Sequence, residues 1–243
     1  VHGKIVFLDT PGHEAFSYMR ERGARVTDLA VLVIAADDGI KPQTIEAIKH
    51  AREADVPILV AINKIDKLQS TAGIETVKRQ LAQHDLLPED WGGDIICVPI
   101  SAKTGEGVGE LLEMIVLQSQ MLELKADPNV AAKAFVLESK VETGHGPVAT
   151  VICRNGTIEV GDYFICGSST GKARLLINSF GERVAKAGPA IPVQVVGFDN
   201  FVSLGDWLNV VSVEEYSKAK SNKRSGSAGS LISGFSEGAD VGS

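Results

Sequence analysis

Hydrophobic residues in the first 125 positions form short continuous runs, separated by stretches with helical spacing. Four runs of large apolar and β-branched residues predict buried strands, and each run ends in polar residues and a turn. These runs are residues 4–8, 29–36, 56–62 and 95–100. Helices are expected between and after them, over residues 12–26, from Pro42, over residues 74–81 and from Val108. Strands that alternate with helices predict a mostly parallel sheet with right-handed crossovers.

A different pattern begins after residues 126–129. Helical spacing ends there, and short strands alternate with Gly and Asn-Gly turns. The expected strands are residues 134–141, 148–153, 163–166, 173–177, 193–196 and 207–211. Even spacing of short strands predicts a small antiparallel barrel. From Glu214 the chain turns polar, and residues 225–243 contain eleven Gly or Ser residues, which predicts a disordered tail.

The charge of the chain is uneven. Its net charge is −7, and residues 1–125 account for −6 of it, with 13 Lys and Arg against 19 Asp and Glu. An acidic first half argues against broad nonspecific nucleic-acid binding through that surface. It does not exclude docking on a nucleic-acid assembly through a local basic patch, such as Arg20, Arg22 and Arg25.

The composition argues against a membrane-spanning protein and against a metal site held by cysteines. No apolar run reaches membrane-spanning length and no signal-peptide pattern opens the chain, so no membrane partner is expected. The three cysteines, Cys97, Cys153 and Cys166, lack metal-ligand spacing and are odd in number. They are interpreted as buried thiols in a reducing compartment.

The polar residues that end the first apolar run form a candidate phosphate and metal corner. Ligands of open α/β sheets bind at the carboxyl ends of the strands. At such a position the Asp9 carboxylate can hold a hydrated Mg²⁺, and Gly12 lets a backbone N–H approach a phosphate closely. His13 would lie beside the terminal phosphate and position the attacking water. The alternative is that His13 is a surface or capping residue, as most lone loop histidines are.

Two later strand ends carry residues that suit a guanine base. Asp66 can accept both N1–H and N2–H₂ of guanine, Asn63 can tie the base edge to neighbouring loops, and the Lys64 stem can cover the base plane. At the next strand end, residues 101–103 (Ser101, Ala102 and Lys103) can bring a backbone N–H to the guanine O6. Each motif alone also fits an ordinary polar loop. Together, in this chain order and at three strand ends, they predict one guanine-nucleotide site.

Two glycine-rich segments imitate nucleotide-binding motifs. Residues 144–149 match a G-x-G-x-x-A fingerprint, but Pro147 and a β-rich run follow where a helix would have to begin. Residues 167–173 resemble a P-loop, but they have only three residues between the glycines and lack the final Ser or Thr. Both segments are predicted to be turns of the barrel.

The segments Asp9-Thr10-Pro11-Gly12-His13-Glu14-Ala15-Phe16, Met19-Arg20-Glu21-Arg22-Gly23-Ala24 and Ala35-Ala36-Asp37-Asp38-Gly39 closely resemble bacterial-type translation initiation factor two, a translational GTPase family. The likeness continues through residues 42–48, 61–66 and 101–103, and residues 146–150, 156–157 and 161–162 resemble the second, β-barrel domain of that family. It covers about residues 1–213 and leaves out the Gly/Ser tail. The fold class it implies is α/β, a partial P-loop GTPase domain with a mostly parallel sheet, followed by a small antiparallel β-barrel domain. The expected domains are a partial GTP-binding domain over residues 1–125, a barrel over 130–213 and a polar tail over 214–243.

The resemblance implies a GTPase that helps place initiator tRNA on the small ribosomal subunit and promotes subunit joining. Its cofactors are GTP or GDP and Mg²⁺. Asp9 would serve Mg²⁺ through water, Gly12 would contact the γ-phosphate and His13 would orient the attacking water. Asn63, Lys64 and Asp66 would recognise guanine, assisted by Ser101, Ala102 and Lys103. The implied partners are the ribosome, at the small subunit and the subunit interface, and initiator tRNA through a domain absent from these residues. A monomer in the cytoplasm is expected, with the mitochondrial or chloroplast matrix as alternatives.

Besides the initiator-tRNA domain, two further family features are missing from the 243 residues. No G-x-x-x-x-G-K-[ST] motif and no switch-one threonine segment precede Lys4. In related GTPases the P-loop strand lies between the strands that end here at Asp9 and near Asp37, so both would lose a shared partner. The P-loop also supplies most phosphate contacts. The chain alone is therefore expected to bind GTP poorly, to hydrolyse it negligibly and to be an internal fragment of a working enzyme.

Two other functions stay open at this point. An elongation-factor relative would share the D-x-P-G-H and N-K-x-D motifs and the barrel, although residues 14–16 favour initiation. A non-catalytic ribosome-docking module that has lost its P-loop would also fit.

Overall fold

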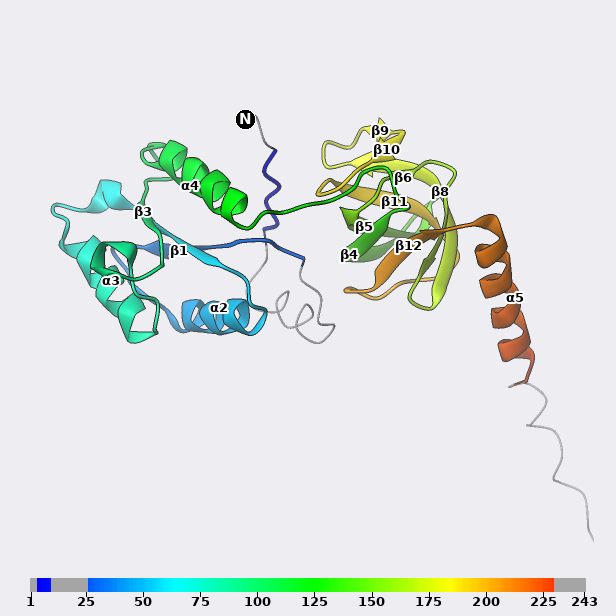
Figure 1. Ribbon diagram of the computed structural model, residues 1–243, viewed down its shortest axis with the longest axis horizontal. Helices are drawn as coiled ribbons and strands as arrows, with labels where there is room; N and C mark the ends of the chain where they lie inside the picture. Colours follow the sequence, from blue (N-terminus) through cyan, green and yellow to red (C-terminus); the bar gives the residue numbers. More distant parts are fainter. Residues whose placement is uncertain (1–3, 10–25, 230–243) are drawn as a thin grey trace, which may run out of the picture. The chain divides into compact units, whose positions relative to one another are not determined.

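The structure is a computed structural model, and it describes residues 4–9 and 26–229 (Figure 1). The chain divides into two compact units, residues 1–125 and residues 126–243, and each is described by itself. The helix predicted over residues 12–26 lies largely outside the described residues.

A three-stranded parallel sheet organises the first unit. Its strands are β1 (Ala30–Ala35), β2 (Ile58–Asn63) and β3 (Cys97–Pro99), in the order β1-β2-β3. The helices that connect or follow them are α2 (Pro42–Glu53), α3 (Ala72–Gln83) and α4 (Val108–Met121), with short 3₁₀ turns η1 (Ile65–Lys67) and η2 (Glu89–Trp91). Three of the four predicted strands and the α/β alternation are therefore confirmed.

The helices cover both faces of this sheet. On one face α2 and α3 pack against Leu32, Ile34, Val60 and Ile62, with Val77 and Leu81 of α3 fully buried. On the opposite face α4 packs against Leu59, Ala61 and Val98 through Ile115 and its partly buried neighbours. The result is the three-layer arrangement typical of α/β domains, in which the carboxyl ends of the strands are free to carry a site (Figure 1).

Residues 4–8 do not form the strand that their apolar pattern predicts. Residues 4–9 have no regular secondary structure, and the side chain of Phe7 is 64% exposed. A strand needs a neighbour to satisfy its backbone N–H and C=O groups. Among the described residues, no strand of the first unit pairs with residues 4–9. Apolar composition alone is not enough where the pairing partner is missing.

The second unit is a closed antiparallel barrel of six strands. They are β4 (Lys133–Glu142), β5 (Gly146–Asn155), β7 (Tyr163–Cys166), β8 (Ser169–Asn178), β11 (Pro192–Phe198) and β12 (Trp207–Val211). The sheet order runs β11-β5-β4-β12-β7-β8, and pairing of β11 with β8 closes it. Three two-residue strands, β6 (Ile158–Glu159), β9 (Arg183–Val184) and β10 (Lys186–Ala187), complete the unit. Alternate residues of the long strands, including Phe164, Leu176 and Leu208, fill the interior, which confirms the predicted barrel.

The two glycine-rich segments that resemble nucleotide-binding motifs, residues 144–149 and 167–173, lie at turns of the barrel, as predicted. Gly144 and Gly146 have φ values of +85° and +76° in the β4–β5 hairpin, a backbone region that favours glycine. Gly167, with φ of +52°, begins the two-residue connection between β7 and β8. Neither segment is followed by a helix, so neither offers a helix N-terminus to a phosphate.

The tail prediction is wrong for its first half. Helix α5 (Val213–Gly229) occupies the region that was expected to be disordered from Glu214. Ser212 and Glu215 form a capping box, in which the Glu215 N–H donates to Ser212 Oγ at 3.3 Å and the Ser212 N–H donates to Glu215 Oε2 at 2.9 Å. The rest of the predicted tail, residues 230–243, lies outside the described residues.

Contacts with the barrel hold the first turns of α5. The rings of Tyr216 and Tyr163 lie 4.7 Å apart between centroids, and Lys220 Nζ lies 3.1 Å from Asp199 Oδ2. Lys220 also donates to the Tyr216 hydroxyl at 2.9 Å. The polar composition that suggested disorder is therefore compatible with a helix, because an N-cap and tertiary contacts stabilise it.

The cysteines are only partly as expected. Cys153 and Cys166 are buried in the barrel core, whereas Cys97 on β3 is half-buried, because β3 is an edge strand. Burial raises the pKa of Cys97 and Cys153 to about 11 and that of Cys166 to about 12. Within residues 4–9 and 26–229, no helix is both long and apolar enough to span a membrane.

Candidate nucleotide-binding site

The predicted base-binding residues meet at one edge of the parallel sheet. In the register of the strands, Asn63 lies opposite Ala35 and Ile62 lies opposite Pro99. The Ile100 N–H donates to the Ile62 carbonyl at 2.8 Å, which extends this pairing to the end of the strands. The loops that follow β2 and β3 are consequently adjacent, although 38 positions separate Asn63 from Ser101 in the sequence.

Asn63 ties these two loops together. Its Oδ1 accepts the Lys64 N–H at 2.7 Å and the Ala102 N–H at 3.0 Å. An asparagine side chain can accept from two donors because its carbonyl oxygen has two lone pairs. The hydrogen bond from the Ala102 N–H thus joins the loop after β2 to the loop after β3, and the contact of Asn63 with a base edge stays a prediction.

The buried Ser101 side chain forms a hydrogen bond with the Asp66 carboxylate. Ser101 is fully buried, and its Oγ donates to Asp66 Oδ1 at 2.7 Å while it accepts the Thr104 N–H at 3.2 Å. Asp66 itself is exposed. A buried hydroxyl thereby orients a carboxylate that faces solvent, and a short hydrogen bond to a charged acceptor is stronger than one between neutral groups.

Lys64 extends from the loop toward the residues after β1. Its backbone is left-handed, with φ of +69°, which is uncommon for a residue other than glycine. Its Nζ lies 3.2 Å from Asp37 Oδ1 and 3.3 Å from Asp38 Oδ2. Hydrogen bonds from Lys64 to Asp37 and then Asp38 raise the pKa of the Lys64 ammonium. The Lys67 ammonium, at 3.1 Å, is the main cause that lowers the pKa of Asp37.

Four predicted site residues remain, and the structure describes two of them, Lys103 and Asp9. Lys103 lies exposed directly after Ala102. Asp9 is exposed at the end of the irregular segment 4–9. Gly12 and His13 lie outside the described residues. The structure therefore brings together Asn63, Lys64, Asp66, Ser101 and Ala102, and leaves the phosphate corner as a prediction.

No role at the site was predicted for Asp37 and Asp38, yet both contact Lys64. Two acids at one strand end and two lysines, Lys64 and Lys67, just after the neighbouring strand end are a charge pattern that would have indicated this contact.

The donor and acceptor set of the two loops fits a guanine base. Asp66 presents an exposed carboxylate as acceptor, and the Lys103 N–H has no acceptor among the described residues. Among residues 4–9 and 26–229, no three His, Cys, Asp or Glu side chains converge in a group that could hold a metal ion. The expectation of Mg²⁺ therefore stays a prediction from Asp9 and from the family resemblance.

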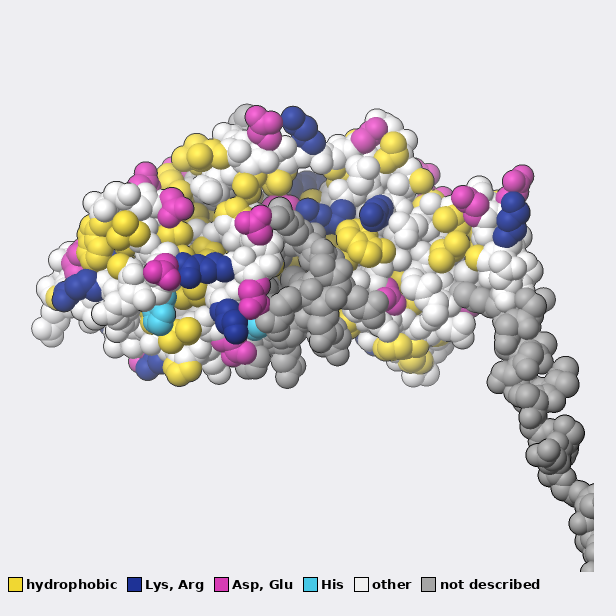
Figure 2. Space-filling view, turned by 60° about the horizontal axis from the view of Figure 1, so that its bottom comes forward, with side chains coloured by type: hydrophobic (Ala, Val, Ile, Leu, Met, Phe, Trp, Pro, Cys, Tyr) yellow, Lys and Arg dark blue, Asp and Glu magenta, His cyan; other side chains and the backbone are white. Residues whose placement is uncertain are grey.

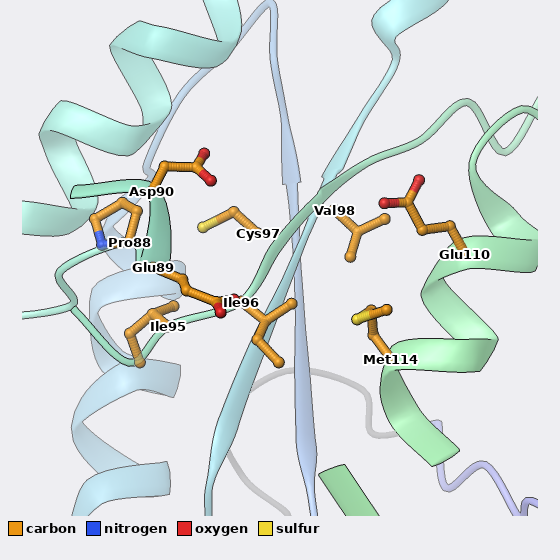
Figure 3. Close-up of a pocket in the computed structure, with 9 residues that line it drawn as sticks. All are labelled: Pro88, Glu89, Asp90, Ile95, Ile96, Cys97, Val98, Glu110 and Met114. Carbon is orange, nitrogen blue, oxygen red and sulfur yellow. The ribbon is translucent and has the colours of Figure 1, made fainter. Parts of the chain in front are cut away.

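A cavity of about 160 Å³ lies elsewhere in the first unit, at the outer edge of β3 (Figure 3). In Figure 3, Glu89 and Asp90 lie on one side of Cys97 and Val98, and Glu110 and Met114 of α4 lie on the other. None of its lining residues belongs to the predicted nucleotide site. This cavity is separate from the loops after β2 and β3.

Comparison with known proteins assigns both units. Residues 2–121 match the family model of the elongation factor Tu GTP-binding domain, and residues 131–211 match that of elongation factor G domain 2. Among solved structures, GDP-bound aIF5B from Aeropyrum pernix is similar with a TM-score of 0.76 and 27% identity, covering 86% of this chain and 43% of that chain. Elongation factor SelB from Methanococcus maripaludis in complex with a GTP analogue has a TM-score of 0.63 and 26% identity, covering 83% of this chain and 45% of that chain.

Curated relatives are more similar in sequence. Translation initiation factor IF-2 of Halothermothrix orenii is 53% identical over 221 residues, which is 91% of this chain and 32% of that protein. The same factor of Aquifex aeolicus is 53% identical over 221 residues, 91% of this chain and 27% of that protein. The chain thus spans about a third or less of these relatives' length. On this identity, and on the match of both units, the chain belongs to the family of translation initiation factor IF-2.

Proposed function

We propose that these residues are the guanine-nucleotide-binding and barrel parts of a GTP-hydrolysing translation initiation factor. The observation that carries the proposal is the joining of the loops after β2 and β3 by Asn63 and by the Ser101–Asp66 hydrogen bond. Two independent loops with the residue types that a guanine base needs converge at the sheet edge where α/β proteins bind ligands. The similarity to GDP-bound aIF5B supports the same class of ligand.

Base recognition is assigned to groups at this edge. Asp66 accepts the N1–H and N2–H₂ donors of guanine, a pattern that adenine does not offer. The Lys64 stem covers the base plane. Because the Ala102 N–H already donates to Asn63 Oδ1, the N–H that reaches the guanine O6 is that of Lys103. Asn63 acts indirectly, by fixing both loops.

The phosphate side rests on the motif that runs from Asp9 to His13. Asp9 is proposed to contact Mg²⁺ through water, and Gly12 to bring its N–H to the γ-phosphate. His13 orients the water for in-line attack on that phosphate. When bound, Mg²⁺ neutralises charge that develops on the phosphate oxygens. The protein contributes positioning and electrostatic stabilisation, and no covalent intermediate is required.

The proposed partners follow from the family. The whole protein acts on the ribosome, at the small subunit and the subunit interface, and assists initiator tRNA through a further domain. It is proposed to work as a monomer in the cytoplasm or in an organelle matrix. On the face seen in Figure 2, acidic and basic side chains are interspersed over both units, so docking there would use local contacts rather than one large basic surface. The initiation factors among the curated relatives favour initiation over elongation.

The test uses a P-loop form, in which a G-x-x-x-x-G-K-[ST] segment precedes these 243 residues and the proposed initiator-tRNA domain follows them. GTP hydrolysis and initiator-tRNA binding are measured with and without ribosomes. We expect ribosome-stimulated GTP hydrolysis and a preference for initiator over elongator tRNA on the ribosome. Preference for elongator tRNA would contradict an initiation role, and absence of any stimulated hydrolysis would contradict the GTPase assignment. Isothermal titration of the 243-residue chain with GDP is the control, and binding at micromolar concentration or tighter would show that the P-loop is not needed.

A further inference from the structure

Lys64 is held by two carboxylates that belong to neither of the predicted base-binding loops. Its Nζ lies 3.2 Å from Asp37 Oδ1 and 3.3 Å from Asp38 Oδ2, and both acids follow β1. The proposed base-binding residues follow β2 and β3. A third strand end therefore contributes to the geometry of this edge.

The segment that carries the two acids is itself fixed. The Asp38 and Gly39 N–H groups donate to the Ala35 carbonyl at 3.1 and 2.9 Å, and Gly39 has a φ of +70°. The Ile40 N–H donates to Gln80 Oε1 of α3 at 2.8 Å. The turn is thus anchored to β1 on one side and to α3 on the other. Its carboxylates are placed before any ligand arrives.

The charges around Lys64 form a connected group of ion pairs. Asp37 also accepts from Lys67 Nζ at 3.1 Å, so two acids and two lysines share contacts at this edge. Lys41 lies 3.6 Å from Asp38 at the rim. Individual exposed ion pairs contribute little to stability, but a network around one ammonium restricts where that side chain can lie. Lys64 would otherwise sample many rotamers, because a lysine side chain is long and flexible.

We propose that Asp37 and Asp38 are positioning residues for nucleotide binding, which hold the Lys64 stem in the orientation that covers the base. The inference rests on the proposed function, because it assigns these acids to the same nucleotide site. They act through Lys64 and do not touch the base. Since the stem contacts the base plane and not its hydrogen-bonding edge, they increase affinity without changing the choice between guanine and xanthine. That choice belongs to Asp66.

The first experiment tests the contact itself in the 243-residue chain without nucleotide. Lysine amines are acetylated with limiting reagent at pH 9, and the modification of Lys64 is measured by peptide mass spectrometry. In Asp37→Asn/Asp38→Asn, Lys64 should react at least about twofold faster, because its amine loses the contacts that keep it protonated. Asp94→Asn, which removes an exposed acid of the same unit, is the matched control. Equal Lys64 reactivity in wild type and double variant would overturn the inference.

The second experiment is a double-mutant cycle on GDP affinity in the P-loop form. Asp37→Asn/Asp38→Asn should weaken GDP binding about three- to tenfold, the range expected for two exposed charge contacts. In a Lys64→Ala background the same two changes should have no further effect on GDP affinity, because the ammonium that the two carboxylates contact is absent. A purely structural role would lower affinity equally in both backgrounds. Asp38→Glu should restore part of the affinity.

Three results separate this inference from the proposed function. If the wild-type P-loop form binds GDP and the acid variants weaken it only when Lys64 is present, both stand. If wild type binds GDP and the variants bind equally well or more tightly, the inference is wrong and the proposed function survives. If the wild-type P-loop form does not bind GDP, the proposed function fails, and the positioning role fails with it.

Discussion

The buried Ser101 hydroxyl donates a hydrogen bond to the exposed Asp66 carboxylate at 2.7 Å, across 35 positions of sequence. Ser101 is also fixed by its own loop, because its N–H donates to the Glu106 carbonyl at 2.9 Å and its carbonyl accepts the Gly105 N–H at 2.8 Å. A rigid donor therefore orients the acceptor that we assign to the guanine edge. This kind of pre-organisation raises affinity, because less freedom is lost on binding.

Ser101→Ala tests that support. The change removes the donor to Asp66 and leaves the Thr104 N–H without its acceptor, so we expect a stability loss of about 1–2 kcal/mol. In the P-loop form GDP affinity should fall about fivefold or more, by loss of one hydrogen bond to a charged group. Thermal unfolding and GDP titration measure the two effects. Ser119→Ala on α4, which removes a hydroxyl from the same unit, is the control. GDP affinity unchanged by Ser101→Ala would show that Asp66 needs no such support.

His13→Ala tests the water-positioning role. In the P-loop form it should lower ribosome-stimulated GTP hydrolysis by about a hundredfold or more, because side chains that position a reacting group or transfer its proton contribute to the rate on that scale. GTP and GDP affinity should stay nearly the same, since the imidazole acts on the water and not on the nucleotide. Single-turnover hydrolysis and equilibrium titration separate the two quantities. A large loss of affinity with normal hydrolysis of bound GTP would mean that His13 has a structural role.

Tyr216→Ala should release α5 from the barrel. Its ring packs on Tyr163, over which Lys172 Nζ also lies at 4.9 Å from the ring centroid. Loss of an aromatic pair costs about 0.5–1.5 kcal/mol, so trypsin cleavage after Lys218 and Lys220 should become several-fold faster. Tyr216→Phe is the matched control, since it keeps the ring and removes only the hydroxyl that accepts from Lys220. Equal cleavage rates in Tyr216→Ala and wild type would show that the stacking does not hold the helix.

The thiols should be slow to alkylate in the native protein. Burial raises the pKa of Cys97 to about 11, so at pH 8 only about one thiol in a thousand is a thiolate. Its modification by iodoacetamide should be about a hundredfold slower than that of a free cysteine and should rise about tenfold per pH unit up to pH 10. Intact-mass spectrometry follows the reaction, and full modification of all three cysteines in denaturant is the control. Rapid modification of native Cys97 at pH 8 would contradict the raised pKa.

Sequence patterns correctly predicted the strands that have a hydrogen-bonded neighbouring strand among the described residues. The apolar runs that became β1, β2 and β3 each have a neighbouring strand, and the even spacing after residue 129 produced a closed barrel. Residues 4–8 have an equally apolar pattern but no strand, because periodicity records burial and not the presence of a hydrogen-bonding neighbour. The disorder predicted from Glu214 rested on composition, which does not record the capping box that Ser212 and Glu215 form.

The candidate site was predictable in its residues and not in its contacts. Motif order placed Asn63, Asp66 and Ser101 at neighbouring strand ends, and the structure brings them together. Spacing did not indicate that the Ala102 N–H is already used by Asn63, nor that Lys64 reaches Asp37 and Asp38. Those contacts depend on the left-handed backbone of Lys64 and on strand register, which a motif does not contain.

The central claim is that the Asp66 carboxylate accepts the N1–H and N2–H₂ hydrogen bonds of guanine, and Asp66→Asn tests it most directly. In the P-loop form, affinities for GDP and xanthosine diphosphate are measured for wild type and variant by equilibrium titration. Because xanthine presents a carbonyl oxygen where guanine presents an amino group, the variant should bind GDP at least about tenfold more weakly and xanthosine diphosphate more tightly than wild type does. A variant that keeps the wild-type preference for GDP would contradict the assignment of this edge as the base-binding site.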